Sequence, residues 1–344
     1  MSIRTIEELE QHIKLRPHER QWKEGPLSLP LLITDYYLSL IDPSDPDDPL
    51  RRQVVPTAVE NLETASESPD PLAETAHSHG QRLIHRYSNR VAFLATDLCA
   101  QYCRHCFRRR FTGNMQGPAT EAEVDSTARY LKEHSGIREL LLTGGDPLTL
   151  SNKNLFSMIK KFRNASPSLV IRICTRMPVV QPQRITADLV QGLSGFDTAP
   201  FYLMVQFNHP RELTREAIGA VAMFVDAGIP AMNQSVLLRG INDNADTLEQ
   251  LCNALVLARI KPYYLFQGDL VSGTSDFRVP LERGMAIEQE LRKRLSGLAM
   301  PVYAADLPDG GGKVPLVQSY LKGKTYDGAW LFSTLEGQMR TYPD

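Results

Sequence analysis

The chain has 344 residues, of which 42% are hydrophobic and 23% charged, and its formal net charge is -2. This composition predicts a globular protein with a sizeable core, in one large domain or two ordinary ones. The near-neutral charge gives no reason to expect a nucleic-acid partner. No apolar run approaches the roughly 18 residues of a membrane span, and residues 1–20 are too polar for a signal peptide. Five cysteines form no even disulfide framework, which predicts a reducing cytoplasm.

Residues 1–85 are expected to form a mainly helical N-terminal extension. The pattern of 5–15 predicts a short helix, and 31–41 reads as another helix or a buried segment. Proline-broken loops follow at 42–49 and 67–72. Because apolar clusters recur throughout this part, we interpret it as folded and not as a linker.

A regular alternation begins near residue 91. Six short β-rich apolar runs are predicted as strands, at 91–96, 139–144, 169–175, 201–207, 231–238 and 262–267. Amphipathic helical patterns separate them, at 121–134, 151–162, 185–193, 214–228 and 245–258. The repeat of about thirty residues is typical of parallel βαβ units. It predicts an α/β core over residues 86–300, a closed or partial (β/α)6 barrel, with a doubly wound open sheet as the alternative.

In either architecture the active site lies at the C-terminal ends of the strands. Charged, amide and glycine residues gather after all six predicted strands, in a cysteine-containing loop and in GGDP, CTRMP, QFNHP, LLRGIND and QGDLVSG. Ordinary loop polarity explains any one of these segments. It explains the agreement of all six less well, so these loops are expected to line one site.

Three cysteines stand close together in the loop after the first strand. Cys99, Cys103 and Cys106 have the spacing C-x3-C-x2-C, and thiolates suit zinc or iron–sulfur clusters. Three ligands to a four-iron cluster leave one iron open for a substrate or cofactor. Cys174, on a predicted strand, and Cys252, in a predicted helix, are interpreted as buried small apolar residues.

A run of glycines precedes Lys313 in "ADLPDGGGKVPL", residues 305–316. Three consecutive glycines cost conformational entropy and call for a reason. The segment is not a Walker phosphate loop, because Val314 stands where Ser or Thr is required. It remains either a flexible turn with a surface lysine or a pliable loop carrying a Schiff-base lysine for pyridoxal phosphate.

The cysteine spacing, with Tyr102 before the second cysteine, resembles the radical S-adenosylmethionine superfamily. The resemblance implies a full or partial (β/α) barrel and a [4Fe-4S] cluster on Cys99, Cys103 and Cys106, whose open iron binds S-adenosylmethionine. The segment 144–147 resembles the second signature of that superfamily. By this resemblance Gly144, Gly145 and Asp146 bind S-adenosylmethionine.

Several further motifs resemble the lysine 2,3-aminomutase family, in its short bacterial form. They are HRYSNR, CRHCFRRRF, NQSVLLRGIND, PYYLFQGDL and DLPDGGGKVPL, and the resemblance spans about residues 48–322. It implies an isomerase that interconverts L-α-lysine and β-lysine on a pyridoxal phosphate aldimine, through a 5′-deoxyadenosyl radical. Some short forms make β-lysine for attachment to elongation factor P. The alternatives are an aminomutase for arginine or, less favoured, glutamate, or a metal-dependent RNA-binding module.

The same resemblance assigns roles to individual residues. It implies that Lys313 carries pyridoxal phosphate, that Gln234 lies near S-adenosylmethionine, and that Arg108 pairs with the substrate carboxylate. The phosphate of pyridoxal phosphate is assigned to Arg86, Tyr87 and Arg90. The distal ammonium of lysine is assigned to Asp269 and Asp306. Arg109 and Arg110 are expected to belong to a solvated basic run or to support the site from behind.

Two departures from the family pattern stand out. Gln206 occupies a position where many relatives have a histidine, and Asn244 stands where long forms place a zinc ligand. No cysteine follows Cys252, so no zinc is expected. The segment 301–344 is expected to be a short cofactor-binding part. The expected partners are an amino acid, an external electron donor and a second copy in a homo-oligomer, with no membrane or nucleic acid.

Overall fold

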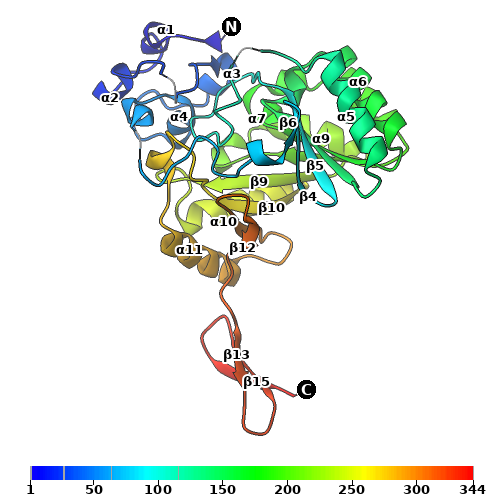
Figure 1. Ribbon diagram of the computed structural model, residues 1–344. Helices are drawn as coiled ribbons and strands as arrows, with labels where there is room; N and C mark the ends of the chain where they lie inside the picture. The colour runs from blue at the N-terminus through cyan, green and yellow to red at the C-terminus, as the bar shows by residue number, and fades with distance from the viewer. Residues whose placement is uncertain (1, 26–27, 63, 115, 344) are drawn as a thin grey trace.

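A ten-stranded curved sheet forms the centre of the computed structural model, which describes residues 2–25, 28–62, 64–114 and 116–343 (Figure 1). Its strands lie in the order β12-β11-β10-β9-β8-β7-β6-β5-β4-β3. The bounds are β3 (Ser78–His79), β4 (Leu83–Tyr87), β5 (Arg90–Thr96), β6 (Glu139–Gly144), β7 (Val170–Thr175), β8 (Phe201–Val205), β9 (Ala231–Leu237), β10 (Ile260–Gln267), β11 (Val302–Leu307) and β12 (Gly312–Pro315). Strands β5 to β11 are parallel, and antiparallel strands close each edge.

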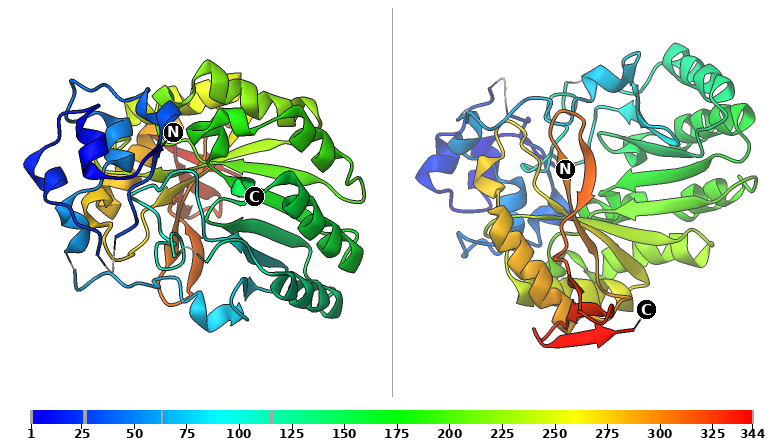
Figure 2. Two further views of the ribbon diagram at one scale, coloured as in Figure 1. Left: turned by 90° about the horizontal axis from the view of Figure 1, so that it is seen from above. Right: turned by 60° about the horizontal axis from the view of Figure 1, so that its bottom comes forward.

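Helices connect the parallel strands and cover the outer face of the sheet, as Figure 2 shows. Side chains such as the hydroxyl of Thr120 and the amide of Asn244 cap the N-termini of several of them, which satisfies otherwise unpaired backbone N–H groups. Their bounds are α5 (Glu121–Glu133), α6 (Asn152–Ala165), α7 (Met177–Val180), α8 (Ala187–Ser194), α9 (Arg215–Asp226), α10 (Ala245–Leu257) and α11 (Leu281–Arg294). Short 3-10 turns are η3 (Pro147–Thr149), η4 (Pro182–Arg184), η5 (Pro210–Glu212) and η6 (Ser275–Phe277).

The architecture is a partial barrel and not a doubly wound sheet. The parallel strands follow one another in sequence order, without the reversal that a doubly wound sheet has. All six strands and five helices expected from the sequence are present, and β11 adds a seventh parallel strand. Along β7 the burial alternates, with Ile171, Ile173 and Thr175 buried. The side chains on the opposite face of this strand therefore point toward the barrel interior.

The N-terminal extension consists of short elements around the cysteine loop. They are β1 (Ser2–Ile3), α1 (Ile6–Glu10), α2 (Pro17–Arg20), β2 (Ile33–Thr34), α3 (Asp35–Leu38), α4 (Pro49–Val54), η1 (Ala58–Asn61) and η2 (Thr75–His77). The backbone N–H of Tyr102 donates to Leu32 O at 3.1 Å, and that of Arg104 donates to Gln53 O at 2.8 Å. The extension is thus hydrogen-bonded to the cysteine loop at two separate points. The central sheet crosses both expected boundaries, at 85 and 300, so the division into three parts stays a prediction.

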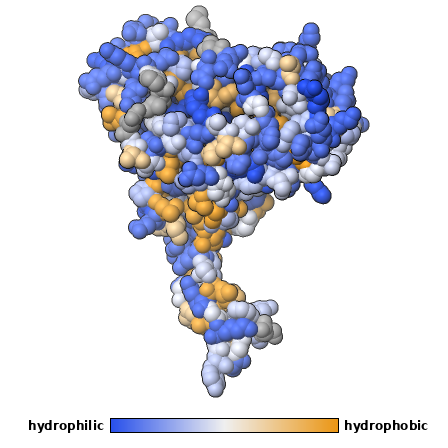
Figure 3. Space-filling view, in the orientation of Figure 1, coloured by the Kyte–Doolittle hydropathy of each residue, from blue (hydrophilic) through white to orange (hydrophobic). Residues whose placement is uncertain are grey.

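The last strands form a small sheet of their own that projects from the body (Figures 1 and 3). It contains β13 (Leu321–Lys324), β14 (Trp330–Ser333) and β15 (Met339–Tyr342), joined antiparallel. Several of its apolar side chains are exposed, namely Leu321, Tyr326, Phe332, Leu335, Met339 and Tyr342.

No helix in the described part of the chain is long and apolar enough to cross a bilayer.

Candidate active site

A cavity of about 550 Å³ opens at the C-terminal ends of the parallel strands. Its wall contains every residue that the sequence assigned to a site: Arg86, Tyr87, Arg90, Cys99, Cys103, Cys106, Arg108, Gly144, Gly145, Asp146, Gln234, Asp269, Asp306 and Lys313. These residues come from the N-terminal strands, the barrel and the C-terminal hairpin. The fold therefore brings together what the sequence keeps up to 227 positions apart, from residue 86 to residue 313.

The cysteine loop is held by two buried arginines. The guanidinium of Arg104 donates to Glu60 Oε2 at 2.6 Å and to Leu29 O at 3.0 Å, and that of Arg109 donates to Glu60 Oε2 at 3.0 Å. Arg109 also donates to Gly273 O at 2.8 Å. The expectation of a solvated basic run is therefore wrong for Arg109, because a single carboxylate on η1 draws two arginines of the loop into the interior.

The three thiols of the cysteine loop line one cavity, and thiolates are the ligands of a [4Fe-4S] cluster. Burial raises the pKa of Cys99 well above its ordinary value, and Asp146, Cys106 and Cys103 add to the shift, so these groups lie close together. Within the described ranges no three His, Cys, Asp or Glu side chains converge on one metal-ion position.

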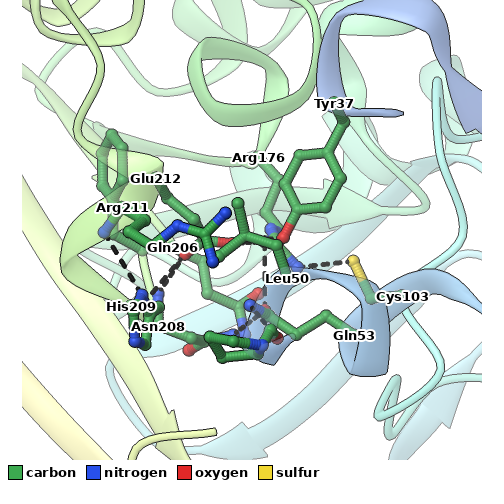
Figure 4. A network of polar contacts seen from close by, with 12 residues as sticks. Tyr37, Leu50, Gln53, Cys103, Arg176, Gln206, Asn208, His209, Arg211 and Glu212 are labelled. Carbon is green, nitrogen blue, oxygen red and sulfur yellow. Dashed lines mark hydrogen bonds and ion pairs between the residues drawn. The ribbon is translucent and has the colours of Figure 1, made fainter. Parts of the chain in front are cut away.

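Arg176, at the end of β7, contacts one of these cysteines (Figure 4). Its Nη1 lies 2.8 Å from Cys103 Sγ, and its Nη2 lies 2.5 Å from Glu212 Oε1. Burial raises the pKa of Cys103, and Arg176 opposes that shift. The loop 174–178 is recognisably polar in sequence, but no motif there indicates a role for Arg176.

The glycines after β6 allow two backbones to meet. Gly144 has a φ of +120°, and a Cβ there would lie 2.3 Å from Thr96 O. A Cβ on Gly145 would lie 2.2 Å from Leu98 O. The carboxylate of Asp146 accepts from the backbone N–H of Arg176 at 2.8 Å and from the Thr175 hydroxyl at 2.7 Å. These contacts give the GGD segment a packing role, while its contact with S-adenosylmethionine stays a prediction.

Two arginines flank a tyrosine on the N-terminal side of the cavity. The guanidinium carbon of Arg90 lies 3.6 Å from the centre of the Tyr87 ring, and that of Arg86 lies 4.8 Å from it. Arg86 Nη2 also donates to the Tyr87 hydroxyl at 2.6 Å. Two guanidinium groups and a phenol give several donors in a small volume, which suits a phosphate group.

Lys313 lies on strand β12 and not on a pliable loop, so that expectation is wrong. The backbone pairs Asp306 with Lys313 across the β11–β12 hairpin. Gly310 lies in its turn with a φ of +76°, and Gly312 begins β12 with a φ of +84°. Lys313 Nζ lies 2.5 Å from Asp306 Oδ2 and 4.0 Å from the centre of the Phe266 ring. The amine thus lies beside a carboxylate and over an aromatic face inside the cavity.

Not all N–H donors of the Arg108 guanidinium are hydrogen-bonded within the described residues. Its Nη2 donates to Glu74 Oε1 at 2.9 Å, and its Nε donates to the same oxygen at 3.1 Å. Its Nη1 donates to the Thr143 hydroxyl at 3.0 Å. A guanidinium has five N–H donors, so two remain without a partner among the described residues. Two donors are what a bidentate pair with a carboxylate requires.

The two carboxylates assigned to the ammonium differ in their surroundings. Asp306 accepts from Arg86 Nη2 at 2.8 Å, in addition to Lys313. Asp269 has no hydrogen bond or ion pair within the part of the chain that the structure describes. Burial, and then the charge of Asp306, raise the pKa of Asp269 to about 7. Lys313 and Arg108 oppose this shift, so Asp269 is a buried carboxyl group with cations nearby but without an ion pair among the described residues.

Gln206 and Gln234 both line the cavity. Gln206 stands where many relatives have a histidine. Its Nε2 lies 3.4 Å from Nε2 of a different histidine, His105. Burial, followed by Arg176 and Arg109, lowers the pKa of His105 well below its usual value, which keeps the ring neutral. Gln234 lies on β9, opposite Tyr264 of β10.

The sequence missed several cavity residues. Cys252 is buried as expected, but Cys174 is only partly buried and lines the cavity, so its assignment to the core was wrong. The cause is the alternation along β7, which turns Arg172 and Cys174 to the face opposite the buried isoleucines. Glu74 was also missed, because the 3-10 turn that follows it carries no recognisable motif.

Residues 93–252 match the family described as the Radical SAM superfamily. The chain is 42% identical to the L-lysine 2,3-aminomutase of Clostridium subterminale over 343 residues, which cover 99% of this chain and 82% of that protein. The chain belongs to the lysine 2,3-aminomutase family of radical S-adenosylmethionine enzymes. Aminomutases are isomerases, so the chain is an isomerase, and the alternative of an RNA-binding module is wrong.

Other members of the family differ in their named substrate. The chain is 38% identical to the L-lysine 2,3-aminomutase of Bacillus subtilis, covering 100% of this chain and 72% of that one. It is also 37% identical to the glutamate 2,3-aminomutase of Clostridioides difficile, covering 98% and 79%. A radical SAM methyltransferase from Sphaerobacter thermophilus aligns with a TM-score of 0.46 and 18% identity, over 65% of this chain and 68% of that one. Membership in the superfamily implies S-adenosylmethionine and a [4Fe-4S] cluster as cofactors.

Proposed function

We propose that this protein is an L-lysine 2,3-aminomutase, which interconverts L-α-lysine and β-lysine. The observation that carries the proposal is the charge pattern of one cavity, in which Arg108 keeps two free donors while Asp269 and Asp306 lie near each other. A substrate with one carboxylate and a distal ammonium matches that pattern. Identity alone does not select lysine, because both lysine and glutamate enzymes are relatives at similar levels.

Cys99, Cys103 and Cys106 are the proposed ligands of the [4Fe-4S] cluster, and Gly144, Gly145, Asp146 and Gln234 the proposed contacts of S-adenosylmethionine. When bound, the reduced cluster and S-adenosylmethionine supply a carbon radical that removes a hydrogen atom from the substrate. The protein contributes position and exclusion of water, because the cysteine loop is enclosed by the N-terminal extension. An external one-electron donor is part of the proposal.

Arg86, Tyr87 and Arg90 are proposed to hold the phosphate of pyridoxal phosphate, with Lys313 as its lysine. The donor set fits, since two guanidinium groups and a phenol lie at one end of the cavity. When bound, pyridoxal phosphate supplies a carbon that holds the substrate's amino nitrogen and a conjugated ring that delocalises an unpaired electron. Tyr87 also orients the strand of Lys313, because its hydroxyl accepts from the Lys313 backbone N–H at 3.1 Å.

Asp306 supports lysine as the substrate in a direct way. It already accepts a lysine ammonium, that of Lys313, which is the same chemical group as the distal end of the substrate. Asp269 adds a second carboxyl group that forms no ion pair among the described residues, although Lys313 and Arg108 lie near it. Two carboxylates attract a compact ammonium and repel the side chain of glutamate. The planar, larger head of arginine is expected to fit less well, so arginine is the intermediate candidate.

The proposed compartment is a reducing cytoplasm, since none of the five cysteines forms a disulfide and three of them are the proposed cluster ligands. The expected homo-oligomer and the absence of zinc stay predictions. Anaerobic turnover of the reconstituted protein tests the proposal, with L-lysine, L-arginine and L-glutamate offered separately and products identified by mass spectrometry. We expect β-lysine as the main product. A fully loaded enzyme that converts glutamate faster than lysine would contradict the proposal.

A further inference from the structure

The guanidinium of Arg176 lies between a cysteine and a carboxylate, inside the polar network of Figure 4. Arg176 is buried, with 7% of its surface exposed, and its Nη1 donates to Cys103 Sγ at 2.8 Å. We propose that Arg176 is a positioning residue for the iron–sulfur cluster, which holds Cys103 in place and raises the reduction potential of the cluster. The inference rests on the proposed function in taking Cys103 as a cluster ligand.

The position of Arg176 is fixed at both ends. At the backbone, its N–H donates to the carboxylate of Asp146 at 2.8 Å. At the tip, Glu212 Oε1 accepts from Arg176 Nη2 and from the hydroxyl of Tyr37, the latter at 2.7 Å. The other oxygen, Glu212 Oε2, accepts from the backbone N–H of Asn208 at 2.6 Å. With these partners in place, the guanidinium has one arrangement, and that arrangement faces the sulfur.

Charge explains why this contact favours the reduced cluster. Reduction adds an electron, and a nearby positive charge or a hydrogen bond to a ligating sulfur stabilises the added negative charge. The guanidinium supplies both to Cys103. No guanidinium donates to Cys99 or Cys106 within the described residues, so the effect is concentrated on one of the three ligands. Glu212 neutralises part of the charge, which limits the cost of burying Arg176.

The network also ties this ligand to the N-terminal extension. Tyr37 lies in α3 and Gln53 in α4, and Gln53 Oε1 accepts from Arg176 Nη2 at 3.3 Å and from Asn208 Nδ2 at 3.0 Å. The ring of Tyr37 lies 5.8 Å below the Arg176 guanidinium, a cation–π distance. The extension is therefore part of the environment that determines the potential, in addition to enclosing the loop.

The test is a redox titration of the reconstituted cluster, followed by electron paramagnetic resonance without S-adenosylmethionine or substrate. In Arg176→Gln we expect the ratio of reduced to oxidised cluster at a given potential to fall about tenfold, a shift of about 59 mV for one electron. Arg176→Lys keeps the charge without the fork, so its shift should be smaller. Arg163→Gln is the matched control, because Arg163 is buried but donates to Ala199 O and Pro200 O instead. Its potential should equal that of the wild type.

Three results would overturn the inference. One is an unchanged potential in Arg176→Gln with full iron content, and another is an equal shift in Arg163→Gln. The third is a weaker affinity for S-adenosylmethionine at unchanged potential, which would make Arg176 a ligand of that molecule. If Arg176→Gln loses iron, Tyr37→Phe is measured instead. Removing the Tyr37 hydroxyl leaves Glu212 free to pull Arg176 away from Cys103, so we expect a smaller shift of the potential in the same direction. An unchanged potential in Tyr37→Phe would contradict the inference. A wild-type protein without a cluster would instead contradict the proposed function.

Discussion

Asp269 is the residue whose protonation is most open to measurement. Its pKa of about 7 results from burial and from Asp306, and the neutral form attracts a substrate ammonium less than the carboxylate does. Below pH 7 Asp269 is mostly protonated in the substrate-free enzyme. Each further decrease of one pH unit therefore lowers the affinity for the substrate by about a factor of ten. We therefore expect the KM for L-lysine to rise about tenfold from pH 8 to pH 6.

Steady-state kinetics across this range, at constant ionic strength, give the measurement. Asp269→Asn is the control, because it cannot titrate; its KM should be high and independent of pH. A wild-type KM that stays flat between pH 8 and pH 6 would show that Asp269 does not meet the ammonium.

Lys313 is expected to be the lysine that carries pyridoxal phosphate, because no other lysine in the described part of the chain lines the cavity. Borohydride treatment of the loaded protein should fix the pyridoxyl group on the peptide that contains residues 310–313. Lys313→Ala should keep its iron and lose turnover. Peptide mapping checks this, with Lys261 for comparison, since its Nζ is already bound to Leu298 O at 2.7 Å. Label on Lys261 would refute the assignment.

At the scale of residues, the reactive side chains could be predicted from the sequence, but the side chains that contact them could not. The cysteine spacing and the glycine run are local patterns, so Cys103 and Lys313 could be found by reading along the chain. The pairs Arg108–Glu74 and Arg176–Cys103 join residues 34 and 73 positions apart, and no periodicity encodes such contacts. They follow from the fold alone.

At the scale of elements, the cysteine loop depends on one buried ion cluster. Glu60 of η1 accepts from both Arg104 and Arg109, and its side chain is only 4% exposed. Removing one partner of a buried ion pair costs about 3–5 kcal/mol, so Glu60→Gln should lower the melting temperature and the iron content. Asp226→Asn is the comparison, because its pair with Arg259 is exposed and worth at most about 1 kcal/mol.

Thermal unfolding and iron analysis of both variants check this prediction. Glu60→Gln with the melting temperature and iron of the wild type would mean that the loop is held by other contacts, such as the backbone bonds to Leu32 and Gln53.

The elements of the barrel could be predicted and those of the edges could not. Strands β5 to β10 are apolar runs separated by amphipathic helices, a pattern that reads directly as βαβ units. Strand β12 holds Lys313 in a hairpin whose turn has two residues of positive φ, Asp309 and Gly310, and Gly312 begins the strand, also with a positive φ. Glycine-rich sequence is compatible with a loop or a turn, and only pairing with β11 decides for the turn.

At the scale of the whole molecule, three distant parts of the chain complete one site. Glu74 comes from the segment before the barrel, the cysteines from its first loop, and Lys313 from the hairpin after its last parallel strand. The central sheet runs through all of these parts, from β3 to β12. The charge pattern of the cavity is therefore a property of the complete fold.

The measurement that tests the central claim most directly is kcat/KM for L-lysine and L-glutamate in the wild type and in Asp306→Asn. Asp306 is mostly buried, and removing its charge should cost the lysine reaction a factor of about 10² to 10³. The account predicts that the wild type prefers lysine by a wide margin and that Asp306→Asn loses most of that preference, with its iron content unchanged. An Asp306→Asn variant that converts lysine as fast as the wild type, or a wild type that prefers glutamate, would contradict it.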